Sequence, residues 1–198
     1  MSELNLIIAG VGGQGSILAS HIVAIAAIKA GLRARVGETF GAAMRGGAVA
    51  SHVRIGKTVE GPLVPCDGAD VIVAVEPLEG LRNAVKFLKP GGLVITNIHP
   101  WYPMDVNIGR ARYPSMEEIE QAISKLKGKL IKLDATKLAQ EAGNVRTANT
   151  VMLGALAATG RLPFPAEVLK EAIKENVPPK TVDANARAFE LGMKALSK

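Results

Sequence analysis

Residues 4–15 read LNLIIAGVGGQG, an apolar run that passes directly into a glycine-rich turn. The run predicts a β-strand over residues 4–9, and a helical pattern follows over residues 16–30. Gly10, Gly12 and Gly15 fit the dinucleotide-binding spacing G-x-G-x-x-G, in which glycines permit a tight turn and a close approach of the backbone to a phosphate at a helix N-terminus. Because proteins that bind no dinucleotide build the same turn, the spacing alone leaves the function open.

Composition and pattern together favour an α/β fold. Hydrophobic residues make up 48% of the 198 residues and aromatic residues only 4%, a balance that suits parallel strands covered by helices. Further strands are expected over residues 32–37, 48–55, 70–75, 93–97 and 129–134, and further helices over residues 78–88 and 115–127, before a mainly helical C-terminal part. We therefore predict one domain, residues 1–198, with three layers, α/β/α, around a mostly parallel Rossmann-like sheet.

The sequence argues against a membrane, secreted or metal-binding protein. The apolar run nearest to membrane length, residues 17–28, contains Ser20 and His21 and is shorter than the roughly 18 residues that a span requires. The first residues lack the basic region and cleavage site of a secretory signal, so we expect a cytoplasmic protein. Cys66 is the sole cysteine, whereas an iron–sulfur cluster needs about four thiolates, and the three histidines lack ligand-like pairing.

The charge of the chain bears on its partners. A net charge of +6 and a pI near 9.5 favour an acidic partner or an anionic ligand. Nucleic acid is disfavoured, because the basic residues are not interleaved with aromatic residues that could stack on bases.

A dinucleotide site makes a second demand, which is an acidic residue roughly 20 residues beyond the motif, at the end of the next strand. Glu38 is the candidate, but the strand predicted before it is poorly hydrophobic. Glu38 also leads into a loop of small residues, expected over residues 37–47, and not into a helix. Nicotinamide or flavin binding therefore stays an alternative.

A second glycine pair, Gly46-Gly47, follows Arg45 just before the strand expected over residues 48–55. A cation beside flexible backbone suits the binding of an anionic group or close packing on another chain. A plain turn with a solvated arginine is an equally weighted alternative.

Several groups of residues, with the glycine turn, carry a resemblance to a known family. They are Arg45-Gly46-Gly47 with Ser51-His52-Val53-Arg54, Ala69-Asp70 leading to Val75-Glu76-Pro77, Asn149 with Met152-Leu153-Gly154, and the stretch from Asn185 to Gly192. Over nearly its whole length the chain resembles the gamma subunit, or gamma domain, of 2-oxoacid:ferredoxin oxidoreductases. Among the branches of that family it is most similar to the free-standing small (beta) subunit of indolepyruvate ferredoxin oxidoreductases, and the pyruvate and 2-oxoglutarate branches are alternatives.

The resemblance implies a role within a larger enzyme. Enzymes of this family oxidatively decarboxylate a 2-oxoacid on thiamin diphosphate, pass electrons through iron–sulfur clusters to ferredoxin and release an acyl-CoA. It implies that a large (alpha) partner subunit holds thiamin diphosphate, magnesium and the clusters, and that the present chain has no catalytic residue and is inactive alone, with a contact to coenzyme A left open. The alternatives from other classes are a stand-alone NAD(P)-dependent oxidoreductase and a module that serves only for docking.

The candidate ligand or partner loop comprises Gly10, Gly12, Gly13, Gln14, Gly15, Arg45, Gly46, Gly47, Ser51, Arg54, Glu76 and Asn149. Gln14 is expected either to hydrogen-bond a partner loop or ligand, or only to cap the helix. Arg45 and Arg54 are expected to contact a phosphate or an acidic face of the large subunit. Glu76 follows a central strand at the carboxyl edge, where α/β sheets bind ligands, but it also suits the cap of the next helix.

Three other interpretations concern residues with apolar neighbours. Asn149 and Asn185 are expected to hydrogen-bond interior loops in preference to a ligand. Trp101 and Tyr102 lie in a proline-flanked segment and are either an anchor for a partner or core residues. His21, on a helix expected to be buried, is interpreted as a core histidine.

Overall fold

The computed structural model describes residues 3–41, 43 and 46–196, and all structural statements below concern these residues. Arg45, one of the candidate contact residues, lies outside them. The strands are β1 (Leu4–Val11), β2 (Arg33–Phe40), β3 (Ala48–Gly56), β4 (Ala69–Ala74), β5 (Leu88–Asn97) and β6 (Lys129–Leu133). The helices are α1 (Ser16–Lys29), α2 (Pro77–Phe87), α3 (Met104–Asn107), α4 (Met116–Lys125), α5 (Ala135–Glu141), α6 (Ala148–Ala158), α7 (Ala166–Asn176) and α8 (Val182–Leu196), with short 3-10 turns η1 (Val145–Thr147) and η2 (Pro179–Thr181).

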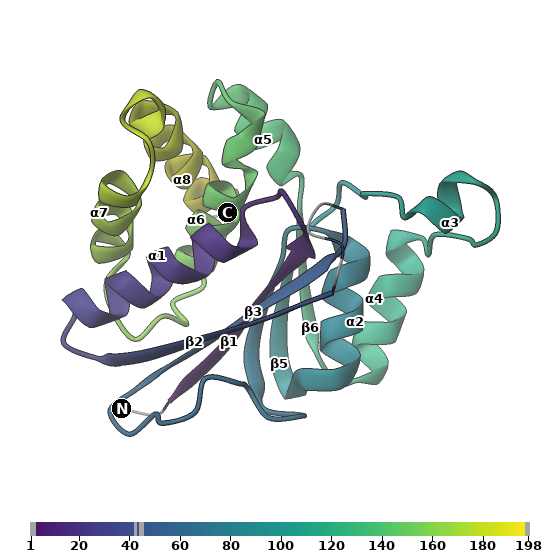
Figure 1. Cartoon of the computed structure of the whole chain (residues 1–198), viewed down its shortest axis with the longest axis horizontal. Coiled ribbons are helices and arrows are strands. Elements are labelled where there is room, and N and C mark those ends of the chain that lie inside the picture. Colours follow the sequence, from purple (N-terminus) through teal and green to yellow (C-terminus); the bar gives the residue numbers. More distant parts are fainter. Residues whose placement is uncertain (1–2, 42, 44–45, 197–198) are drawn as a thin grey trace.

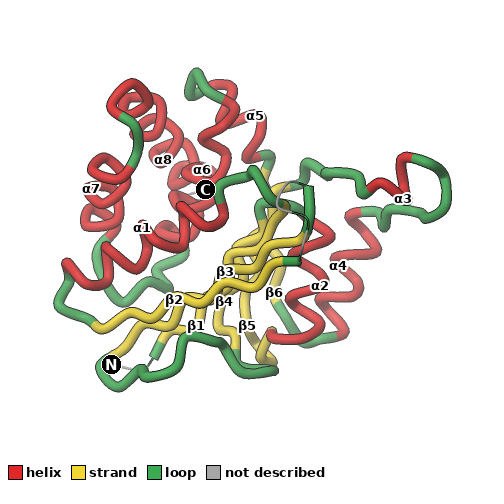
Figure 2. Tube along the Cα trace, viewed as in Figure 1, coloured by secondary structure: helices red, strands yellow, loops and turns green. Residues whose placement is uncertain are grey.

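All six of these strands join one sheet in the order β2-β3-β1-β4-β5-β6 (Figure 2). β1, β4, β5 and β6 run parallel to one another, whereas β3 is antiparallel to both of its neighbours. The predicted mostly parallel sheet is confirmed, and its one antiparallel strand sits directly beside β1.

Helices cover both faces of the sheet (Figure 1). Helix α1 and helices α5 to α8 pack on one face, and helices α2 and α4 pack on the other. Strand β1 shows why. Leu6 and Ile8 point into the core under α1 and α5 to α8, whereas Ile7 and Ala9 point into the core under α2 and α4. A strand that is apolar at consecutive positions must be covered on both faces, which confirms the three-layer α/β/α prediction.

The structure corrects two predicted boundaries. Strand β2 does not stop at residue 37 but continues to Phe40, because it pairs with β3 as far as Phe40 opposite Val49. The loop expected over residues 37–47 is shorter as a result. Strand β5 begins at Leu88 and not at residue 93, because Leu88 pairs with Ala69 before the register shifts.

The C-terminal helices α6 and α8 cross with their backbones in contact. A Cβ atom placed on Gly154 would lie 2.1 Å from the carbonyl oxygen of Phe189, and one on Gly192 would lie 2.0 Å from that of Val151. Glycine at both positions therefore sets the distance between the two helices.

The two outer strands of the sheet carry exposed basic side chains. Strand β2 exposes Arg33 and Arg35, and strand β6 exposes Lys129 and Lys132. In the described part of the chain, no helix combines the length and the apolar character that crossing a membrane requires.

His52 is buried on the α2 side of strand β3. Its Nδ1 atom accepts a hydrogen bond from the Val64 N–H at 3.2 Å, and its ring meets the ring of Phe87 edge to face at 5.0 Å between centroids. Burial, with the charge of Lys86 adding to it, lowers the pKa of His52 below its ordinary value of 6.5. Protonation would also set an Nδ1–H group against the Val64 N–H, so the neutral ring is the form that fits.

This burial predicts a pH dependence of stability. A histidine whose pKa is lowered by folding stabilises the folded chain above pH 6.5, and this contribution is lost as the pH falls from 6.5 through the folded pKa. We expect the free energy of unfolding, measured with urea between pH 7.5 and pH 5.5, to fall less steeply in His52→Asn than in the unaltered chain. The exposed His99 supplies the control, since His99→Asn should keep the original slope. Equal slopes in all three proteins would contradict the role given to His52.

Candidate functional site

The polar and glycine-rich residues singled out in the sequence gather at the carboxyl edge of the parallel strands. β1, β4 and β5 end there at Val11, Ala74 and Asn97. Because β3 is antiparallel, it begins at the same edge, with Ala48 opposite Val11. The topology therefore brings together the turn after β1, the glycine pair before β3, and the segments that follow β4 and β5.

The two glycine-rich segments are bonded directly to each other. The Gly12 N–H donates to the Gly47 carbonyl at 2.8 Å, and the Gly46 N–H donates to the Gly12 carbonyl at 3.1 Å. Gly13 and Gly15 have positive φ angles of 104° and 80°, a conformation that favours glycine. Residues that lie more than 30 positions apart in the sequence thus form one rigid corner.

Gln14 closes the turn and does not cap the helix. Its side-chain Oε1 accepts a hydrogen bond from the Val11 N–H at 3.0 Å, whereas the N-cap of α1 is Gly15, which has no side-chain cap. The fit requires glycine at position 10, since a Cβ atom there would lie 2.8 Å from Oε1 of Gln14 and from Oγ of Ser16. Gln14 is therefore part of the architecture of the turn.

Asn149, on helix α6, is hydrogen-bonded to the glycine turn. Its Nδ2 donates to the Gly15 carbonyl at 3.2 Å, and its Oδ1 accepts from the Thr150 N–H at 2.9 Å. The Thr150 hydroxyl donates to Oδ1 of Asn185 at 2.6 Å, and Nδ2 of Asn185 donates to the Thr181 carbonyl at 2.9 Å. These bonds agree with the interior role expected for both asparagines, and they link helix α8 to the glycine turn.

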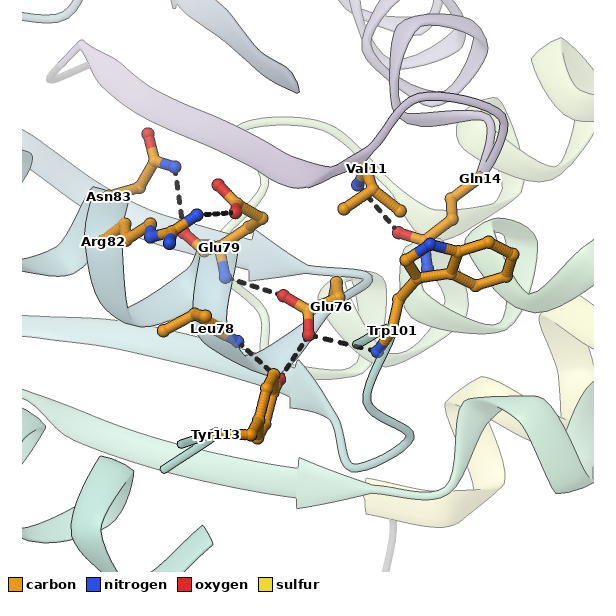
Figure 3. Close-up of polar contacts among 9 residues, drawn as sticks. All are labelled: Val11, Gln14, Glu76, Leu78, Glu79, Arg82, Asn83, Trp101 and Tyr113. Atoms are coloured by element: carbon orange, nitrogen blue, oxygen red, sulfur yellow. Dashed lines mark hydrogen bonds and ion pairs between the residues drawn. The ribbon is translucent and has the colours of Figure 1, made fainter. Parts of the chain in front are cut away.

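Glu76 joins three segments at the centre of the edge (Figure 3). Its side chain caps helix α2 by accepting from the Glu79 N–H at 2.8 Å, and its other oxygen accepts from the Trp101 N–H at 3.3 Å and from the Tyr113 hydroxyl. Glu76 is 1% exposed, so these bonds replace the water that an ionised carboxylate would otherwise need. Both interpretations of Glu76 thus hold in part, because it is a cap and also a junction of the edge.

Tyr113 is a residue of this edge that sequence reasoning missed. Its hydroxyl donates to Glu76 and accepts from the Leu78 N–H at 3.1 Å. Burial and the nearby Glu76 carboxylate raise the pKa of Tyr113 well above that of an ordinary tyrosine, so it remains a hydrogen-bond donor at neutral pH. Tyr113 stands in an irregular stretch with no periodic pattern, and its neighbours in the sequence gave no signal of this contact.

A second carboxylate lies one turn along helix α2. Glu79 pairs with Arg82 at 2.5 Å, as Figure 3 shows, and its side chain is buried. Burial raises the pKa of Glu79 above its ordinary value, and the Arg82 charge opposes this only in part. Both carboxylates are thus tied to partners within the chain.

Two candidate residues are not brought to this edge. Arg54 lies at the opposite end of the sheet, where its guanidinium bonds Asn5 at 2.9 Å and Glu3 at 3.1 Å, so the structure separates it from the glycine turn. Ser51 stands inside strand β3 with no exposed surface, opposite Ile8. The Ser-x-Val-Arg pattern therefore reflects the interior of a strand and an ion pair within the chain.

Glu38 and His21 also differ from expectation. Strand β3 lies between β1 and β2, so Glu38 is two strands away from the glycine turn and does not occupy the place of a ribose-binding acid. His21 is exposed rather than in the core, with its Nε2 atom 3.3 Å from the Glu38 carboxylate. Helix α1 is apolar nearly all round, which had suggested full burial, but one side of it is exposed at Ile17, Leu18, His21 and Ile28.

The surface of the edge is suited to contact more than to proton transfer. A hollow of 370 Å³ opens beside the turn, lined by Gly12, Gly13, Ser16, Ile17, Leu18 and Val49 among others. Ile17 and Leu18 are exposed, and the Trp101 indole lies near Gly46. In the described ranges, no group of three His, Cys, Asp or Glu side chains could hold a metal ion.

Comparisons with known proteins bear directly on this arrangement. Residues 5–195 match the family model described as pyruvate ferredoxin/flavodoxin oxidoreductase. The chain belongs to the pyruvate ferredoxin/flavodoxin oxidoreductase family. The match spans both glycine-rich segments, the Glu76 junction and the C-terminal helices.

Three relatives within or near this family illustrate its range. The chain is 50% identical to indolepyruvate oxidoreductase subunit IorB of Pyrococcus horikoshii, over 98% of this chain and 96% of that one. It is 26% identical to the keto/oxoacid ferredoxin oxidoreductase gamma subunit of Geobacter sulfurreducens, with a TM-score of 0.71 over 98% of each chain. It is 27% identical, with a TM-score of 0.72, to the 2-oxoglutarate:ferredoxin oxidoreductase of Magnetococcus marinus, in which all of the present chain matches 32% of a longer chain.

Proposed function

We propose that this chain is the small subunit of an indolepyruvate oxidoreductase complex, which converts an arylpyruvate and coenzyme A to an acyl-CoA and reduces ferredoxin. The observation that carries the proposal is the 50% identity to a relative named for that activity, over nearly the full length of both chains. A 2-oxoglutarate synthase subunit is 35% identical over 93% of this chain, and the difference from 50% favours the arylpyruvate branch.

The donor chemistry of the chain supports a division of labour. Cys66 is exposed and is the single cysteine of the sequence, so the chain lacks the thiolates that an iron–sulfur cluster requires. We therefore assign thiamin diphosphate, magnesium and the clusters to the large subunit. In the Magnetococcus marinus enzyme a matching region makes up 32% of one longer chain, which agrees with a subunit that acts beside a larger body.

The topology disfavours the dinucleotide alternative. In a nicotinamide-binding fold the acidic residue for the ribose ends the strand adjacent to β1, whereas β3 stands between β1 and the strand of Glu38. The turn after β1 is engaged instead by Gly46 and Gly47. A contact between this chain and coenzyme A stays a prediction.

Reconstitution with the large subunit tests the proposal. Alone, the purified chain should be colourless and should reduce no viologen dye. Mixed with the large subunit, it should restore dye reduction that depends on thiamin diphosphate and coenzyme A, with indolepyruvate turned over faster than pyruvate or 2-oxoglutarate.

Two results would contradict it. The subunit assignment fails when the large subunit is equally active with and without this chain. It also fails when the chain alone binds NADH or NADPH at micromolar concentration and oxidises a substrate.

A further inference from the structure

The segment after β5 leaves the body of the molecule. We define residues 98–110 as the projecting segment; it contains α3, which extends beyond α2 and α4 in Figures 1 and 2. No residue of α3 is buried. The segment nevertheless carries large apolar side chains with half or more of their surface exposed: Trp101 (55%), Tyr102 (50%), Met104 (73%) and Ile108 (51%). Exposed apolar side chains gathered on one short segment indicate a binding surface.

The base of the projecting segment is fixed. Glu76 accepts from the Trp101 N–H where the segment begins and from the Tyr113 hydroxyl just beyond its end. The Tyr113 ring also meets the Tyr102 ring edge to face, at 5.2 Å between centroids. Inside the segment, Nδ2 of Asn107 donates to the Tyr102 carbonyl at 3.2 Å. The apolar side chains are thus displayed on an ordered support, which lowers the entropy lost on binding.

The projecting segment lies next to the glycine corner at the carboxyl edge. The Trp101 indole lies near Gly46, whose N–H is bonded to Gly12 of the glycine turn. Ile17 and Leu18 expose apolar surface at the start of α1, beside the same turn. One partner surface placed against this edge would cover the indole, the glycine corner and the first turn of α1.

The nature of the partner follows from two observations. In the Magnetococcus marinus enzyme the matching region is 32% of a longer chain, so most of that chain lies outside this fold and is available as a partner surface. The guanidinium of Arg110, at the end of the segment, has no partner among residues 3–41, 43 and 46–196, so it would complement a carboxylate at the rim of an apolar groove.

We propose that the projecting segment inserts into an apolar groove with an acidic rim on the large subunit, with Trp101 and Met104 as anchors. Glu76 and Tyr113 are positioning residues, since they hold the base of the segment without touching the partner. This inference rests on the proposed function, because the occupant is the large subunit of that complex.

Titration calorimetry, which measures binding of the full chain to the purified large subunit, tests the anchors. Trp101→Ala and Met104→Ser should each raise the dissociation constant about tenfold or more, as expected for central apolar anchors. Both side chains are exposed, so the variants should unfold at the original temperature. Val85→Ser and Ile28→Ser are matched controls, because they remove similarly exposed apolar side chains from α2 and α1. They should leave the dissociation constant within about twofold of the original.

A separate variant tests the positioning role. Tyr113→Phe keeps the ring but removes the hydroxyl that joins Glu76 to Leu78. The dissociation constant should rise about fivefold to tenfold, whereas the turnover number at saturating large subunit should stay within about twofold. Amide hydrogen exchange in residues 98–110 of the free chain should become faster. A lower unfolding temperature with unchanged binding and unchanged exchange would show that Tyr113 is merely structural and would overturn its assignment.

The outcomes separate this inference from the proposed function. If the unaltered chain does not bind the large subunit, the proposed function fails and the inference fails with it. If the unaltered chain binds but the anchor variants bind equally well, or no worse than the two controls, only the inference is overturned. If the free chain is a dimer that Met104→Ser converts to a monomer, a second copy occupies the surface, and the assignment to the large subunit is again overturned.

Discussion

Replacing Gly192 by alanine is expected to lower the free energy of unfolding by about 3 kcal/mol or more, among the largest losses a single methyl group can cause. The new Cβ atom would lie 2.0 Å from the Val151 carbonyl oxygen and 3.1 Å from the Ala155 nitrogen. Both atoms belong to the backbone of α6, so no side chain can turn away to make room. Alanine favours a helix over glycine by about 1 kcal/mol, but this gain is smaller than the cost of pushing two packed helices apart.

Thermal unfolding measures this effect. For a chain of this size, a loss of about 3 kcal/mol corresponds to a decrease of about 6–12 °C in the midpoint. Gly154→Ala should behave alike, since its Cβ would lie 2.1 Å from the Phe189 carbonyl oxygen across the same crossing. Gly41→Ala is the control, because nothing lies within 4 Å of a Cβ there and the backbone is not left-handed. A midpoint within about 2 °C of the original for Gly192→Ala would show that α6 and α8 can separate freely.

Replacing Gly15 by alanine should reduce the activity of the reconstituted complex at least about tenfold, because displacement of a positioned segment by about 1 Å can cost that much or more. The Cβ atom would lie 2.5 Å from Nδ2 of Asn149, which now donates to the Gly15 carbonyl. Asn149 must move, and the turn loses the bond that ties it to α6. The free energy of unfolding should fall by only about 1–2 kcal/mol, mainly from the left-handed backbone.

Gly13→Ala supplies the matched comparison for this result. Gly13 has a positive φ angle, as Gly15 does, but nothing lies within 4 Å of its Cβ position. It should therefore show the loss of stability with little loss of activity, measured as dye reduction at saturating large subunit. Equal loss of activity in the two variants would assign the effect to backbone strain and would leave Asn149 without a role in holding the turn.

The sequence contained enough information for the layers of the fold. Consecutive apolar residues such as Ile7 and Ile8 in β1 can be buried only when both faces of a strand are covered, and the spacing of the glycines located the turn. The position of β3 between β1 and β2 was not predictable in the same way, because periodicity identifies a strand but not its neighbour. Since β2 gains its length from pairing with β3 as far as Phe40, its end was misplaced for the same reason.

The candidate site was predictable where its residues are local and was missed where they are not. The glycine turn of residues 10–15 follows directly from β1, and Glu76 stands at the edge where ligands of α/β sheets bind, whereas the bonds between Gly12 and the pair Gly46-Gly47 join segments more than 30 positions apart. Arg54 shared a motif with them but follows β3 to the opposite end of the sheet. Tyr113 reaches Glu76 across 37 positions of sequence, a contact that only the folded chain creates.

The basic residues on the outer strands bear on how long an unassembled subunit persists in solution. An uncovered outer strand offers unpaired backbone groups to any other strand, which is a common route to aggregation. Here β2 presents Arg33 and Arg35, and β6 presents Lys129 and Lys132, so two copies that approach by either edge meet like charges. Basic side chains on both outer strands thereby oppose edge-to-edge pairing of newly made copies until each has found its place in a larger assembly.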